Sequence, residues 1–149
     1  MYQILEDLMS EKNLWQYCRR HLSGRGVFMR IENAFYKGVP DVNFLVGGIE
    51  GWLELKFLHN FPKKESTPVK IPHFTQEQKL WHKERFENHG LTAMLLQVDD
   101  HYFLFVGDKI ALVNNLSKKG MIKNANKCWR KRINFEELID TLCHKKTLN

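Results

Sequence analysis

The 149 residues of the chain suffice for one domain but not for two well-buried cores. With 43% hydrophobic and 27% charged residues and no run of about 18 apolar residues, the composition is that of a globular protein and excludes a disordered chain and a membrane-spanning helix. The net charge of +6 lies at one end, because residues 109–149 carry 10 basic and 3 acidic side chains, whereas residues 1–108 carry 13 and 14.

The chain opens with a predicted helix over residues 2–22, where apolar side chains recur mainly at three- and four-residue spacings. Ser10 could instead cap a second helix start, so a break near it stays open. The Ser-Gly-Arg-Gly run at residues 23–26 ends the helix. Alternating apolar residues then predict a strand over residues 27–32.

Two more strands are predicted at residues 41–46 and 52–57, joined by a glycine-rich hairpin connection at residues 47–51. The long loop that follows, residues 59–74, holds three of the four prolines. A loop of this length in a small domain is typically functional, and this one could be a substrate clamp or a dimer arm.

The second half of the chain begins with a capping box, Thr75 to Gln78, which opens a helix that ends near Asn88. Two apolar strands are predicted at residues 91–98 and 101–106 around a two-aspartate turn, and a final helix at residues 134–144. This order predicts a single α/β (α+β) domain over residues 1–149, in which helices flank a central mixed β-sheet.

A dense basic stretch precedes the final helix. Its cationic residues, with one tryptophan among them, are a candidate DNA-binding footprint that would contact phosphates, while the indole could stack on a base or sugar. They are Lys118, Lys119, Lys123, Lys127, Trp129, Arg130, Lys131 and Arg132. A solvated basic loop is the alternative interpretation of such a charge run.

The pattern that carries chemistry is Pro40-Asp41, followed by Glu54-Leu55-Lys56. Asp41 starts one strand of the predicted hairpin and Glu54 lies on its partner, so the two carboxylates can converge on one hard divalent cation such as Mg²⁺. Lys56 shares a face with Glu54, where its ammonium could orient water and counter negative charge on a phosphoryl group. An exposed cross-strand salt bridge, which contributes little energy, is the alternative.

These residues match a known pattern. The run Gly38-Val39-Pro40-Asp41, then Trp52-Leu53-Glu54-Leu55-Lys56, then Thr75 to Trp81 and Gly90, resembles the PD-(D/E)XK nuclease superfamily, and within it the VRR-NUC branch and phage Holliday junction resolvases. The resemblance covers about residues 5–106 and implies a restriction-endonuclease-like core of order αβββαβ. It leaves the basic C-terminal extension, residues 109–149, unmatched.

The resemblance implies a role for each matched residue. Asp41 and Glu54 would be metal ligands, the backbone carbonyl of Leu55 a further ligand, and Lys56 the catalytic lysine. Gln78 would line the active site, although it could equally serve only in the capping box, and the two roles could coexist.

Other positions are less firmly matched. The family places a glutamate of the first helix near the metal, for which Glu11 is our choice and Glu6 the alternative; an exposed helix acid is the competing interpretation. Arg30 fits an arginine often found before the motif, but could equally be an ordinary surface residue. Glu32 is an unexpected acid near the site, either a further ligand or a surface residue.

The resemblance therefore implies a Mg²⁺-dependent DNA endonuclease, with Mn²⁺ able to substitute, that leaves a 5′-phosphate and a 3′-hydroxyl. Branched DNA, above all the four-way Holliday junction of DNA recombination, is the expected substrate, and paired cuts would require a homodimer. A general, flap or restriction-type nuclease and a non-catalytic DNA-binding accessory protein are the alternatives.

The sequence also bears on location. The three cysteines, Cys18, Cys128 and Cys143, are far apart, which argues against a disulfide framework, and the first residues lack the pattern of a secretory signal. We therefore expect a soluble cytoplasmic protein, in the host cytoplasm if the source is a phage, as the resemblance suggests.

Overall fold

A six-stranded sheet forms the centre of the computed structural model, which describes residues 2–31 and 37–147, with side chains described for residues 10–31 and 37–144. The strands lie side by side in chain order: β1 (Val27–Arg30), β2 (Val42–Val46), β3 (Ile49–Leu58), β4 (Thr92–Val98), β5 (His101–Val106) and β6 (Lys127–Arg130). Neighbouring strands in this sheet are antiparallel except β3 and β4, which are parallel. The mixed sheet flanked by helices confirms the predicted fold class.

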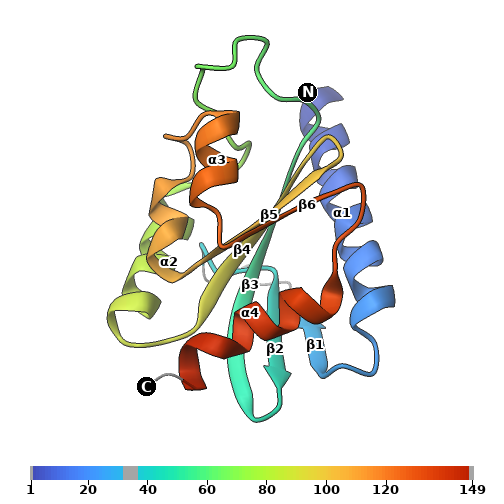
Figure 1. Cartoon of the computed structure of the whole chain (residues 1–149), viewed down its shortest axis with the longest axis vertical. Coiled ribbons are helices and arrows are strands. Elements are labelled where there is room, and N and C mark those ends of the chain that lie inside the picture. The colour runs from blue at the N-terminus through green and yellow to red at the C-terminus, as the bar shows by residue number, and fades with distance from the viewer. Residues whose placement is uncertain (1, 32–36, 148–149) are drawn as a thin grey trace.

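Helices cover both faces of the sheet, and Figure 1 shows α1 (Tyr2–Leu22) on the side opposite α2 (Gln76–Glu87) and α3 (Lys118–Asn124). One apolar core joins α1 and α4 (Phe135–Thr147) to the first face. A second core joins residues 69–74, the 3₁₀ helix η1 (Gly107–Leu112) and α3 to the other face. The helix α2 also lies on this second face. It follows β3 in the chain and supplies the crossover connection that two parallel neighbouring strands require.

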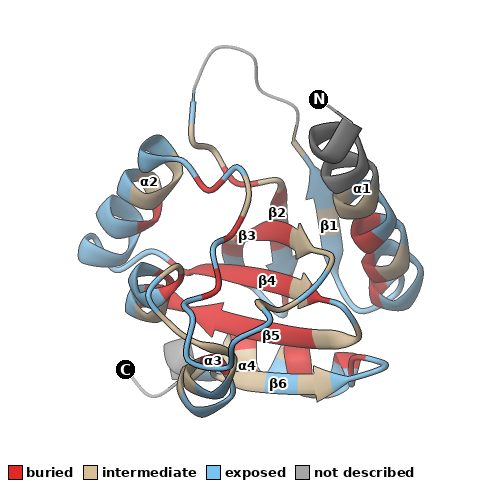
Figure 2. Cartoon of the chain, turned by 90° about the horizontal axis from the view of Figure 1, so that it is seen from above, coloured by how far each residue is buried: buried red, intermediate tan, exposed pale blue. Residues whose placement is uncertain are grey.

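The central strands are buried on both faces, as Figure 2 shows by their red colour. In β4, Leu95 points to the α1 side and Met94 and Leu96 to the α3 side, and all three are fully buried. This explains why the sequence of β4 is a continuous apolar run and not an alternation of apolar and polar residues.

The first helix and the five predicted strands are present, with small shifts. Helix α1 runs without a break through Ser10, so the second helix start considered at that residue is wrong. The hairpin turn is reduced to Gly47-Gly48, because β3 begins at Ile49.

The basic stretch is folded and not a loop. Residues 118–124 form α3, with the Ser117 hydroxyl accepting a hydrogen bond from the backbone N–H of Gly120, and residues 127–130 form β6 at the sheet edge. Just before β6, the Asn126 side chain accepts a hydrogen bond from the backbone N–H of Val106 at 2.8 Å. Charged side chains are common on short edge strands, because they discourage pairing with a further strand. The basic residues of β6 are therefore compatible with its place at the sheet edge.

The C-terminal quarter is part of the core. The hydroxyl of Tyr17 in α1 accepts a hydrogen bond from the backbone N–H of Ile133 at 2.9 Å, and the ring of His21 stacks on Phe135 at 4.9 Å. Leu138 and Leu142 of α4 are fully buried on the same face. Residues beyond 106 therefore complete both layers around the sheet. In the described part of the chain, no helix is long and apolar enough to span a membrane.

We predict that a chain truncated after Asp108 loses cooperative thermal unfolding, because both apolar cores would be opened to water. Circular dichroism melting curves measure this loss. Tyr17→Phe is the control: it removes only the hydrogen bond to Ile133 and should cost about 1 kcal/mol. A cooperative melt of the truncated chain near the full-length temperature would contradict the prediction.

Candidate active site

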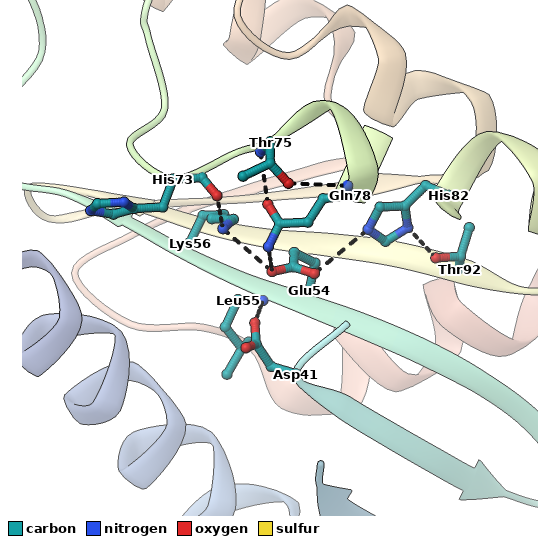
Figure 3. A network of polar contacts seen from close by, with 9 residues as sticks. All are labelled: Asp41, Glu54, Leu55, Lys56, His73, Thr75, Gln78, His82 and Thr92. Carbon is teal, nitrogen blue, oxygen red and sulfur yellow. Dashed lines mark hydrogen bonds and ion pairs between the residues drawn. The ribbon is translucent and has the colours of Figure 1, made fainter. Parts of the chain in front are cut away.

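The hairpin of β2 and β3 brings two acids together. Val42 pairs with Leu53, so Asp41, directly before β2, lies next in register opposite Glu54. The Asp41 carboxylate accepts a hydrogen bond from the backbone N–H of Leu55 at 2.8 Å, which fixes the side chain beside β3 (Figure 3). The two acids predicted from the sequence to converge are therefore neighbours.

Pro40 explains why the strand pairing stops at this point. The two-residue Gly47-Gly48 turn makes Val46 and Ile49 a hydrogen-bonded pair, and every second pair along the hairpin is of the same kind, which brings Leu55 opposite Pro40. Proline has no N–H, so it cannot donate to the Leu55 carbonyl. The Leu55 N–H and carbonyl point to the same side of β3, which places this carbonyl on the Asp41 side, as a metal ligand there would need to be.

Glu54 and Lys56 lie on the face covered by α2, and both are buried, with 1% and 2% of their surface exposed. Lys56 Nζ is 3.4 Å from Glu54 Oε1 and donates a hydrogen bond to the His73 carbonyl at 2.9 Å. His73 adopts a φ of 60°, an unusual value for a residue with a side chain, and its carbonyl accepts from the lysine in this conformation. The lysine is therefore fixed beside the acids by the end of the 59–74 loop.

Gln78 completes the predicted capping box and also contacts Glu54. Its side-chain Oε1 accepts from the backbone N–H of Thr75 at 3.0 Å, and the Thr75 hydroxyl accepts from the backbone N–H of Gln78 at 3.2 Å, which completes the capping box. The same amide donates through Nε2 to Glu54 Oε1 at 3.3 Å. The cap thus orients the amide that contacts the acid (Figure 3).

Gly38 brings the segment before Asp41 against the first turn of α2. It has a φ of +88°, and a Cβ at this position would lie 2.5 Å from the carbonyl oxygen of Glu77 and 3.0 Å from the backbone nitrogen of Gln78. Only glycine tolerates both the conformation and the contact. The close contact with α2 therefore explains why the Gly-Val-Pro-Asp run begins with glycine.

Burial dominates the electrostatics of the acid pair. The pKa of Asp41 is raised to about 7, first by burial and next by the neighbouring Glu54 charge, although the hydrogen bond from the Leu55 N–H acts to lower it. Burial likewise raises the pKa of Glu54, although the Lys56 ammonium acts in the opposite direction. Two acids that are costly to ionise side by side are the setting in which a bound cation stabilises both charges.

Glu11 of α1, our choice for the first-helix glutamate, is close enough for its charge to raise the pKa of Glu54. The alternative, Glu6, and the unexpected acid Glu32 lie outside the described side chains. Arg30 ends β1 and is exposed; the following N–H, of Ile31, donates to the Asp41 carbonyl at 2.7 Å, so Arg30 is close to the site in the fold.

The donor set is suited to a hard cation. Asp41 and Glu54 supply carboxylate oxygens, and Glu54 Oε2 is a buried atom without a hydrogen-bond partner among the described residues. The Leu55 carbonyl adds a third oxygen, and such all-oxygen sets suit Mg²⁺. Nowhere among the described side chains do three or more His, Cys, Asp or Glu residues form a metal-binding group. The hairpin itself thus supplies two acids and a backbone carbonyl, and Glu11 stays the predicted further ligand.

Sequence reasoning missed His82 and Thr92. His82 Nε2 lies 3.8 Å from Glu54 Oε2, and its Nδ1 is hydrogen-bonded to the Thr92 hydroxyl of β4. Burial and the Lys56 charge lower the pKa of His82 to about 4, so its ring is neutral at pH 7. The sequence did offer one signal for His82, which is its spacing from Gln78. The two residues are one helical turn apart and therefore lie on the same face of α2.

The predicted DNA-binding residues form a separate group. Three lie on α3, three on β6, and two follow β6: Lys118, Lys119 and Lys123; Lys127, Trp129 and Arg130; Lys131 and Arg132. β6 is four strands from β2, or about 19 Å across the sheet. The structure thus separates this basic surface from the acids.

Several of these side chains already have partners. Lys127 Nζ is 3.4 Å from Glu137 and Arg130 Nε is 3.2 Å from Asp100, while the Lys118 ammonium lies 4.7 Å from the centre of the Phe61 ring. Trp129 is partly buried and contacts the first apolar core, so part of its indole has a packing role.

No family model matches the chain, and no curated protein is detectably similar to it in sequence.

We predict that Asp41→Asn changes how stability depends on pH in the absence of metal. An acid whose folded pKa is raised binds more protons folded than unfolded, so its contribution to stability falls as pH rises from about 4 to about 7. Asparagine does not ionise, so the variant does not lose this stability as pH rises. Between about pH 4 and pH 7, the free energy of unfolding of the variant should therefore rise by roughly 2–4 kcal/mol relative to that of wild type. Urea unfolding at each pH measures the difference.

The control is Asp99→Asn in the exposed β4–β5 turn, which should follow the wild-type pH dependence. His82, with its lowered pKa, contributes the opposite slope between about pH 4 and 6.5. The two largest causes of that lowering, burial and the Lys56 charge, remain in both variants, so both retain this slope. Parallel curves for wild type and Asp41→Asn would contradict the burial of the acid.

We predict that Gly38→Ala lowers stability by about 1–3 kcal/mol more than Gly24→Ala does. Both glycines have φ above +80°, but the Gly24 position has open space around it, whereas the Gly38 position meets the backbone of α2. The difference between the two variants in urea unfolding isolates the contact. Equal losses would show that the backbone of α2 gives way.

Proposed function

We propose that the chain is a Mg²⁺-dependent endodeoxyribonuclease that hydrolyses phosphodiester bonds, acting on branched DNA such as the four-way junction. The observation that carries the proposal is the group of Asp41, Glu54 and Lys56, of which Glu54 and Lys56 are buried and Asp41 is partly buried. In this group two acids face each other across β2 and β3, and the ammonium is 3.4 Å from one of them. Such a group would combine a cation site with a fixed positive charge, and both would stabilise the negative charge that develops during phosphodiester hydrolysis.

The chain's own residues would divide the work. Asp41, Glu54 and the Leu55 carbonyl would hold the cation, which when bound supplies a Lewis acid that polarises the phosphodiester and makes water more acidic. Gln78 and Lys56 keep Glu54 in place through contacts to the same oxygen, Oε1. The Lys56 ammonium, fixed by the His73 carbonyl, would face the negative charge that grows on the phosphoryl oxygens.

The reaction would be hydrolysis at phosphorus. A water oxygen bonds to phosphorus, the bond to the 3′ oxygen breaks, and that oxygen takes up a proton. The products are a 5′-phosphate and a 3′-hydroxyl, as the resemblance to PD-(D/E)XK nucleases implies.

The choice of DNA rests on charge. The basic residues of β6 lie four strands, or about 19 Å, from β2 across the sheet, so one extended substrate would have to contact both the site and this basic surface. Backbone contacts from lysine and arginine recognise DNA shape more than sequence, as expected for a junction substrate. Two symmetric cuts need two sites, so we propose that the active form is a homodimer.

The first test is cleavage of a labelled four-way junction, a flap and a linear duplex, each with Mg²⁺ and with EDTA. We expect Mg²⁺-dependent paired cuts across the junction and weak cutting of the duplex. Asp41→Asn and Lys56→Ala should each lower the rate at least about 100-fold while leaving junction binding within a few-fold of wild type.

Two exposed residues supply the controls, Asp99→Asn for the acid and Lys83→Ala for the lysine, and both should cut like wild type. Equal cutting of all three substrates would indicate a general nuclease. Binding without cutting would indicate an accessory protein, and full activity in both site variants would overturn the site.

We predict that replacing Arg130, Lys131 and Arg132 by glutamine weakens junction binding and flattens its salt dependence. Each lost phosphate contact should reduce the slope of log K against log salt concentration by about 0.9, so up to about 3 in total. Fluorescence anisotropy over a salt series measures the slope. The triple variant of Arg19, Arg20 and Lys83 removes the same charge elsewhere, and equal slopes for the two variants would contradict a specific role for the β6 end.

A further inference from the structure

His82 lies behind Glu54, on the side away from Gln78 and Lys56. Those two side chains contact Glu54 Oε1, at 3.3 and 3.4 Å, whereas His82 Nε2 faces Glu54 Oε2 at 3.8 Å. Both Glu54 Oε2 and His82 Nε2 are buried atoms without a hydrogen-bond partner among the described residues. A movement of less than about 1 Å would make them partners.

Thr92 decides which atom of the ring can donate. The Thr92 hydroxyl is hydrogen-bonded to His82 Nδ1, and a hydroxyl can donate or accept. If it donates, the neutral ring carries its hydrogen on Nε2 and directs it at Glu54 Oε2. If it accepts, the Nε2 lone pair faces the carboxylate, which is repulsive. With Glu54 as a carboxylate, the arrangement that gives both Glu54 Oε2 and His82 Nε2 a partner has Thr92 donating. Figure 3 shows the ring between Thr92 and Glu54.

We propose that His82 is a positioning residue, whose Nε2–H, directed by Thr92, holds the Glu54 carboxylate in the orientation that binds the metal. This inference rests on the proposed function. The relay Thr92–His82–Glu54 starts on β4, crosses α2 and ends on β3, so it joins three elements that the parallel crossover brings together. Its effect is on Glu54 and not on the substrate.

Two pairs of substitutions separate the hydrogen bond from simple packing. His82→Gln can keep an N–H in the place of Nε2, whereas His82→Leu fills the space without a donor. Thr92→Ser keeps the hydroxyl, whereas Thr92→Val keeps the shape without it. A packing role would be served by leucine and valine, and a hydrogen-bonding role only by glutamine and serine.

The measurement is Mn²⁺ affinity by titration calorimetry, in the absence of DNA. His82→Leu and Thr92→Val should bind Mn²⁺ about 10- to 100-fold more weakly than wild type, the range expected when the partner of a metal ligand is removed. His82→Gln and Thr92→Ser should stay within a few-fold. Thermal melts in EDTA identify any variant that fails to fold. Equal affinity in all four folded variants overturns the proposal.

Nitrogen NMR of histidine-labelled, metal-free protein gives a second measurement that does not depend on metal or activity. The ring signal that disappears in His82→Gln belongs to His82. We expect it to show hydrogen on Nε2, and to shift in Glu54→Gln. Hydrogen on Nδ1 overturns the proposal. If wild type binds no Mn²⁺ while this spectrum shows the expected form, the relay stands and the proposed nuclease function fails.

Discussion

The pair of acids, one buried and one partly buried, constrains the rest of this structure. Asp41 and Glu54 face each other where water cannot fully solvate them, so the fold must supply compensating groups from several elements. The Leu55 N–H donates a hydrogen bond to Asp41. Gln78 donates a hydrogen bond to Glu54, and Lys56 forms an ion pair with it. The sheet, the α2 crossover and the end of the 59–74 loop each place one of these partners. A fold with a purely apolar interior here would need none of them.

The 59–74 loop illustrates how a segment without helix or strand can still be fixed. Val69 and Ile71 are buried in the second apolar core, and their backbone N–H groups donate to the Leu116 carbonyl at 2.8 Å and to the Asn114 side chain at 2.7 Å. The chain therefore reaches His73 in a defined position, and its carbonyl can hold Lys56. The neighbourhood of the lysine depends on packing tens of residues away in sequence.

Contacts between residues close together in the sequence could be predicted, whereas contacts between distant segments could not. The Asp41–Glu54 contact was predictable, because a hairpin sets the register locally, and so was the Thr75–Gln78 cap, which spans three residues. The β6 strand was not, because its four residues pair with β5 across some 20 intervening residues and their charge masked the strand pattern. His82 was missed for a similar reason: it lies on α2, but its contacts are with Glu54 on β3 and Thr92 on β4.

The contact at Gly38 has a consequence for recognising relatives of this chain. Acids separated by a dozen residues recur by chance in many sequences, and an aspartate or glutamate tolerates most neighbours. At Gly38, by contrast, the space that any side chain would need is filled by the peptide between Glu77 and Gln78. A homologue that keeps both acids but has a larger residue here must separate its loop from α2. The smallest residue of the motif is thus a stricter filter for shared architecture than its charged ones.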